Sequence, residues 1–191
     1  MNLKKLFDMQ KKLDEKILER FPHLRNEDLL PKKILALQVE LGELCNCWRG
    51  FKFWSNDQAP RTRITKADIE YFDKTGKVRW KENNPLLEEF VDVLHFLLSI
   101  GLELNVDPTE IRGIYERGSL IEQFNAVFDC VSRFWNRVDR GFSYEEQVEW
   151  YVWTFKGFIV LGHMLGFSWD QIEQAYMKKN AENHARQANG Y

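Results

Sequence analysis

The sequence predicts an all-α helical bundle, in one domain that spans residues 1–191. Three observations lead to this fold class. Apolar residues recur at helical spacing along most of the chain, and Asn, Ser or Pro stands at the start of several of these segments. Strand-like sequence is confined to one polar stretch. With 191 residues, 44% of them hydrophobic, the chain can bury one sizeable core.

The first half of the chain predicts three long helices. Residues 2–20 form a charged amphipathic segment with apolar residues at helical spacing. Pro31 suits the first turn of the next helix, whose apolar seam runs from Ile34 to Trp48. The third helix covers residues 84–105, with Asn84 as the expected cap and proline directly after it.

Residues 55–84 interrupt this pattern with a polar insert. Within it, "IEYFDKTGKVRW" (69–80) predicts a small β-hairpin of two short strands around a Lys-Thr-Gly turn. A polar segment of this length inside a compact domain is usually functional or disordered.

The second half predicts a short capped helix over residues 106–118, long helices over 119–137 and 143–166, and a last helix that starts after Ser168. It also echoes the first half, because residues 101–115 align without gaps on residues 162–176. We interpret the chain as a degenerate duplication of a two-helix unit.

Two alignments, one that extends this register backward and one that pairs Trp48 with Trp135, place four acidic positions of the first half opposite apolar positions in the second. Glu40, Glu43, Glu89 and Asp92 stand opposite, in that order, Val127, Cys130, Trp150 and Trp153. Since only one half carries the acids, they are expected to serve function and not folding.

Composition excludes several classes of protein. The net charge of −2 provides no basic footprint for nucleic acid. No apolar run approaches the roughly 20 residues of a membrane span, and the polar N-terminus is unlike a signal peptide. Three cysteines, two of them in "CNC", favour helix positions in a reducing compartment over a disulfide framework or a metal site. We therefore predict a cytoplasmic protein that binds neither nucleic acid nor membrane.

The four acids form two pairs with three-residue spacing, Glu40 with Glu43 and Glu89 with Asp92. Residues three apart lie on one side of a helix, so the pairs of two facing helices can converge. Four carboxylates suit Mg²⁺ or Mn²⁺, whereas a solvated face would not need the surrounding apolar residues. Glu88 is a rival to Glu89, and a di-iron site is disfavoured because only one D-x-x-H is present.

The C-terminal segment carries a complementary face. Lys179, Asn183 and Arg186 follow one another at helical spacing, with Asn180 and Gln187 beside them. Such a face is often solvated, but next to an acidic metal site it becomes a candidate phosphate clamp.

Four motifs together resemble the all-α dimeric dUTPases, within the MazG-like nucleotide pyrophosphatases: "VELGEL", "FKFW", "EEFVDVLHF" and "YMKKNAENHARQANGY". The resemblance implies a homodimer that hydrolyses dUTP and dUDP to dUMP with Mg²⁺, releasing pyrophosphate or phosphate. Two alternatives stay open: a MazG-like pyrophosphatase for another nucleotide such as dCTP, and a non-catalytic helical interaction module. The insert does not map onto the family's pattern, which leaves the base open.

The resemblance also implies roles for individual residues. Glu40, Glu43, Glu89 and Asp92 would be metal ligands, and one of the first pair, foremost Glu43, would act as the base for water. The other implied roles concern substrate binding, with Gln10 and Trp54 in the uracil pocket (Asp14 as an alternative to Gln10), His95 and Phe96 at the base and deoxyribose, and Lys179, Asn183, Arg186 and Tyr191 at phosphate.

Overall fold

The computed structural model describes residues 2–67, 69–113 and 116–189. These residues form seven α-helices and one two-stranded antiparallel sheet, which confirms the all-α class with a small hairpin. In chain order the elements are α1 (Leu3–Arg20), η1 (Pro22–Asn26), α2 (Leu30–Trp48), β1 (Ile64–Ala67), α3 (Ile69–Thr75), β2 (Trp80–Asn83), α4 (Pro85–Glu103), η2 (Pro108–Glu110), α5 (Leu120–Asp139), α6 (Tyr144–Met164) and α7 (Trp169–Asn189).

The helix starts follow the local capping chemistry. The Asn84 side chain accepts a hydrogen bond from the Leu87 amide at the start of α4, as predicted, and Pro31 lies in the first turn of α2. The predicted helix over 106–118 is wrong in extent, because the described residues of this range (106–113 and 116–118) form only the 3₁₀ turn η2. Asp107 caps that turn, and the chain soon takes a left-handed conformation at Gly113, which does not continue a helix.

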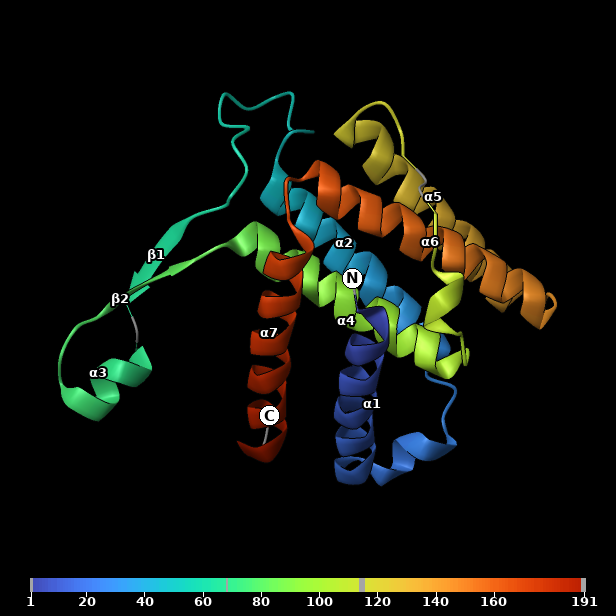
Figure 1. Ribbon diagram of the computed structural model, residues 1–191, viewed down its shortest axis with the longest axis horizontal. Helices are drawn as coiled ribbons and strands as arrows, with labels where there is room; N and C mark the ends of the chain where they lie inside the picture. Colours follow the sequence, from blue (N-terminus) through green and yellow to red (C-terminus); the bar gives the residue numbers. More distant parts are fainter. Residues whose placement is uncertain (1, 68, 114–115, 190–191) are drawn as a thin grey trace.

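Three helix pairs make up the bundle. α2 packs along α4, and α5 packs along α6, while α1 and α7 lie side by side across α4 (Figure 1). One continuous hydrophobic core joins these six helices, and Leu37, Leu41 and Leu44 of α2 are fully buried in it. This packing brings faces of α1, α2, α4 and α7 together.

The predicted internal echo has a counterpart in the packing. Gly101 of α4 lies against Tyr151 of α6, and Gly162 of α6 lies against Phe90 of α4. The register that aligns residue 101 with residue 162 also aligns residue 90 with residue 151. Each half therefore supplies an aromatic side chain to the glycine of the other half, which supports the interpretation as a duplication.

The insert does contain a hairpin, but the predicted strand positions are wrong. Residues 69–73, predicted as a strand, form α3 together with Lys74 and Thr75 of the predicted turn. β1 pairs with β2 on either side of this helix, from Ile64 with Asn83 to Ala67 with Trp80. Gly76, predicted in the turn, has φ of 66° and donates its amide to the Phe72 carbonyl. It therefore ends a helix in the way typical of a left-handed C-cap.

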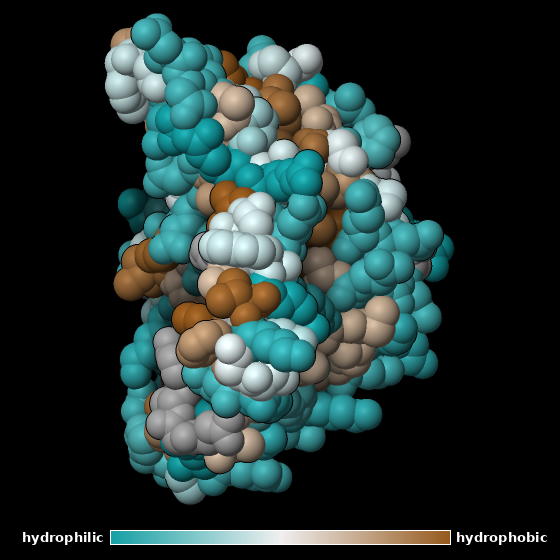
Figure 2. Space-filling model, turned by 90° about the vertical axis from the view of Figure 1, so that its left-hand side faces the viewer, coloured by the Kyte–Doolittle hydropathy of each residue, from teal (hydrophilic) through white to brown (hydrophobic). Residues whose placement is uncertain are grey.

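The insert extends away from the bundle, between α2 and α4 (Figure 1). It exposes several large hydrophobic side chains, among them Phe72 and Trp80. On this side of the molecule, hydrophobic residues form separate patches among hydrophilic ones (Figure 2). Within the described residues, no helix combines the length and hydropathy needed to cross a membrane.

Candidate active site

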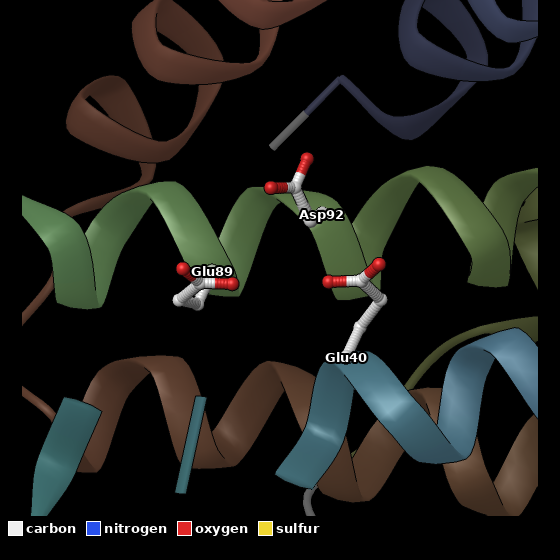
Figure 3. Close-up of side chains that lie close together, drawn as sticks. All are labelled: Glu40, Glu89 and Asp92. Atoms are coloured by element: carbon white, nitrogen blue, oxygen red, sulfur yellow. The ribbon is translucent and has the colours of Figure 1, made fainter. Parts of the chain in front are cut away.

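Three of the predicted acids lie together where α2 packs on α4. Glu40 extends from α2 towards α4, which carries Glu89 and Asp92 (Figure 3). One carboxylate oxygen from each residue lies within 4.8 Å of the others, and all three side chains are partly buried. The apolar seam of α2 fixes this meeting, because Leu37, Leu41 and Leu44 hold the helix against α4.

Glu43 lies apart from this group. It is exposed, one turn along α2 from Glu40, and it is not among the three residues whose oxygens converge. Its charge still reaches the group, since it contributes to raising the pKa of Glu40, Glu89 and Asp92. Glu88, the rival of Glu89 in the sequence, is also outside the converging group within the described chain.

The three acids make an unfavourable concentration of negative charge. Burial, followed by repulsion from Asp92 and the other nearby carboxylates, raises the pKa of Glu89 to about 7. Burial also raises the pKa of Glu40 and of Asp92, the latter against the opposing effect of Lys179, whose ammonium lies 2.5 Å from an Asp92 oxygen. A lysine thus already serves as a counter-cation here, and hard oxygen donors in this arrangement suit a divalent cation such as Mg²⁺.

This charge concentration should be visible in the pH dependence of stability. Because the pKa of Glu89 is about 7 in the folded state and 4.5 without perturbation, the folded chain binds more protons between these values. The contribution of Glu89 is therefore fully present below pH 4.5 and is lost as pH rises through 7. Allowing for solvent screening, the loss should be about 1–2 kcal/mol.

Scanning calorimetry from pH 5 to 8, with and without Mg²⁺, checks this prediction. Burial lowers the pKa of His95, so its contribution to stability rises with pH and opposes that of Glu89. Glu89→Gln keeps His95 and therefore serves as the reference. Without Mg²⁺, the Tm of the wild type should fall relative to the variant as pH rises, and Mg²⁺ should remove this difference by stabilising the folded state. An unchanged wild-type Tm on adding Mg²⁺ at pH 8 would contradict a metal site.

A cavity of ≈370 Å³ adjoins the acids. Faces of α1, α2, α4 and α7 enclose it, so residues far apart in the sequence share one space. Its lining includes eight predicted site residues: Gln10, Glu40, Asp92, His95, Phe96, Lys179, Asn183 and Arg186. The structure therefore brings most of the predicted substrate-binding residues beside the carboxylates.

His95 is held neutral inside this cavity wall. It is buried, and burial lowers the pKa of its imidazole to about 3. Its Nδ1 lies 2.7 Å from Oε1 of Gln10, and its ring stacks on that of Tyr176. His95 and Gln10, from α4 and α1, therefore form one unit, as expected if both face the same part of a ligand.

The cationic face of α7 is only partly as predicted. Lys179, Asn183 and Arg186 line the cavity, but Asn180 is buried. α1 secures the end of α7, because Lys16 donates to the His184 carbonyl at 3.2 Å and Arg20 donates to the Gln187 carbonyl. Tyr191 lies outside the described residues.

Trp54 is placed away from the cavity. It is 65% exposed in the loop after α2, with Phe51 and Phe53 packed edge-on against it, and it is not among the residues that line the cavity. Arg49 and Arg61 both bind Asp57 and brace this loop. Within its own chain, Trp54 is therefore not in position to contact a ligand in the cavity.

Sequence reasoning missed Ser99, which lines the cavity, and Tyr176, which bonds to the cavity residue Gln10. The Ser99 hydroxyl donates to Asp14 at 2.6 Å, and the Tyr176 hydroxyl donates to Oε1 of Gln10 at 2.8 Å. A signal was present, because Ser99 follows His95 by one helical turn within an otherwise apolar stretch of α4. Tyr176 had no comparable signal, since a tyrosine on a helix is more often part of the core.

Carboxylates from two helices and cationic side chains from a third surround one cavity, so a divalent cation and phosphate oxygens could both find ligands there. A family model described as dUTPase matches residues 2–76 and 74–191, and the two matches meet inside the insert. The chain belongs to the all-α dimeric dUTPase family, a family of dUTP pyrophosphatases. No match was found among curated proteins.

Proposed function

We propose that this protein hydrolyses dUTP to dUMP and pyrophosphate, and dUDP to dUMP and phosphate, with Mg²⁺ as the cofactor and Mn²⁺ as a possible substitute. Family membership supports the substrate class. One observation carries the assignment of the site: the converging oxygens of Glu40, Glu89 and Asp92 lie beside the cavity that Lys179 and Arg186 also line.

The residues fit a divalent cation through the chemistry of their donors. Glu40, Glu89 and Asp92 would hold Mg²⁺, with Glu43 completing the ligand set from the exposed side. Bound Mg²⁺ would supply charge neutralisation at phosphate and a lowered pKa for a coordinated water. The carboxylate of Glu43 is the proposed base that takes the proton of the attacking water.

The cationic residues of α7 complete the phosphate site. Once Asp92 is a metal ligand, the ammonium of Lys179 is free to bind a phosphate oxygen. Arg186 and Asn183 supply further donors along the same face, and Tyr191 is proposed to join them. The negative charge of the phosphates would then be neutralised by the cation that the acids hold and by the Lys179 and Arg186 side chains of α7.

The remaining lining residues are proposed to bind the nucleoside. Gln10 and His95, whose side chains contact each other at 2.7 Å, are proposed to face the base, and Phe96 is proposed to face the deoxyribose. The proposed role of Trp54 at uracil requires either that its loop moves towards the cavity or that Trp54 of a second copy of the chain reaches the cavity. A homodimer is supported by exposed apolar side chains on α2, where Leu35 and Val39 lie one turn apart.

A nucleotide panel tests the proposal. Wild type and Glu43→Gln are incubated with Mg²⁺ and dUTP, dUDP, dCTP, dTTP or UTP, and the products are separated by ion-exchange chromatography. We expect dUMP from dUTP and dUDP, and at least a hundredfold lower rate in the variant, since a well-placed general base contributes about 10²–10⁴-fold.

Other outcomes assign the protein differently. Preferred turnover of dCTP would support the same hydrolytic mechanism but would identify the protein as a pyrophosphatase for another nucleotide. No turnover of any nucleotide, with Mg²⁺ present and the chain folded, would favour a helical interaction module.

A further inference from the structure

A continuous chain of hydrogen bonds runs along the cavity wall, from α4 through α1 and back to α4. The hydroxyl of Ser99 donates to one oxygen of Asp14 at 2.6 Å, and the other oxygen accepts from Nε2 of Gln10 at 2.7 Å. Oε1 of Gln10 lies 2.7 Å from Nδ1 of His95 and accepts from the hydroxyl of Tyr176. Gln10, His95, Ser99 and Tyr176 are all buried.

Burial raises the pKa of Asp14, whereas the hydrogen bonds from Ser99 and Gln10 and the charge of Lys33 favour its ionised form. An ionised carboxylate at this end gives the whole chain a direction. A carboxylate only accepts hydrogen bonds, so the amide of Gln10 must turn its NH₂ group towards Asp14. Its oxygen then faces His95, and Nδ1 of His95 must carry the hydrogen. A neutral imidazole has one N–H, so Nε2 is left as a bare acceptor.

This acceptor is unsatisfied within the protein. Nε2 of His95 is buried and has no hydrogen-bond partner among the described residues. A buried acceptor without a partner is unfavourable, so a ligand whose binding opens access to Nε2 and offers it an N–H gains a hydrogen bond that water does not already supply. The ring that carries this atom lines the cavity proposed for the nucleotide.

We propose that Asp14, oriented by Ser99, is a positioning residue for base selection: it fixes the Gln10 amide and thereby the Nδ1–H tautomer of His95, so that the cavity selects a base with an N–H donor. The inference rests on the proposed function and deepens it. Uracil carries such a donor at N3, where cytosine in the same pose has a lone pair.

Asp14→Asn is the sharpest variant, because it keeps the shape of the side chain and removes its fixed polarity. An asparagine amide can present either its oxygen or its NH₂ group to Gln10. Gln10 can then turn over, and the hydrogen of His95 can move to Nε2. Asp8→Asn, an exposed aspartate on the same helix, is the matched control.

The first readout is the tautomer itself, from long-range ¹H–¹⁵N spectra of the imidazole groups. The chain has four histidines, and the spectrum of His95→Gln identifies the resonance that belongs to His95. We expect Nδ1–H in the wild type and in Asp8→Asn, and a gain of Nε2–H in Asp14→Asn. The melting temperature of Asp14→Asn is measured alongside, because an imidazole released into water also favours Nε2–H and a loss of packing must be distinguished from the proposed effect.

The second readout is the binding of dUMP and dCMP, by calorimetric titration with Mg²⁺ present. The wild type should prefer dUMP, and Asp14→Asn should reduce that preference by about tenfold, the effect of one misplaced hydrogen bond. Ser99→Ala, which leaves Asp14 in place but less well held, should lie between the two. If Asp14→Asn fails to fold, the base preference of Ser99→Ala and the His95 tautomer of the wild type still test the inference.

Two results would overturn the inference: an Nε2–H tautomer in the wild type, or an unchanged tautomer and base preference in both variants. Neither readout needs hydrolysis. A wild type that binds dUMP through the Nδ1–H tautomer without turnover would leave this inference standing and overturn the proposed activity.

Discussion

Replacement of Asp92 with asparagine is expected to lower kcat for dUTP roughly thousandfold, equivalent to about 4 kcal/mol of transition-state stabilisation. Asp92 has two roles at the proposed site, because its carboxylate converges with Glu40 and Glu89 and also binds Lys179. An amide keeps the shape but removes the negative charge that would hold the cation. It also removes the ion pair that holds Lys179 at the cavity before metal and substrate bind.

The matched control is Glu88→Gln on the same helix. Glu88 lies one turn before Asp92 and is outside the converging group, so its loss should change kcat less than threefold. Steady-state rates with dUTP, together with melting curves for folding, measure both variants. Equal losses in the two variants would point to a general charge effect on α4, and full activity in Asp92→Asn would exclude the proposed ligand set.

The helical scaffold could be predicted because its determinants are local. The apolar seam from Ile34 to Trp48 and the Asn84 cap act within one or two turns of helix, and the structure has both. The insert shows where local reasoning failed. "KTG" suits a hairpin turn, but Gly76 equally suits the end of a helix, and the preceding residues form α3.

The site could be predicted only as far as helical spacing fixes it. Spacing placed Glu89 and Asp92 on one side of α4, and the meeting with Glu40 follows from the seam of α2. Helical spacing could not show that Glu43 lies apart from the other three acids, because the rotation of α2 against α4 depends on tertiary packing. The contact of Asp14 with Ser99 depends on how α1 crosses α4, and no local pattern specifies that crossing.

The close approach of α4 and α6 leads to the largest expected effect on stability. Gly101→Ala should lower the free energy of unfolding by about 3 kcal/mol, although alanine normally stabilises a helix interior. A Cβ at position 101 would lie 2.1 Å from the hydroxyl oxygen of Tyr151 and 2.8 Å from the Phe7 ring. Both rings are buried, and the Tyr151 hydroxyl donates to the Leu97 carbonyl at 2.8 Å, so relief of the clash would break a buried hydrogen bond.

Gly42→Ala in α2 isolates the contribution of packing. It is the same substitution in a helix, but a Cβ at position 42 would meet no atom within 4 Å. Helix propensity should then stabilise the protein by about 0.5–1 kcal/mol. Urea unfolding of both variants gives the change in the free energy of unfolding for each substitution. Changes of opposite sign support the glycine contact between the halves. A stabilising Gly101→Ala would mean that Tyr151 can move away freely, and the aromatic–glycine pairs would then not hold the two halves together.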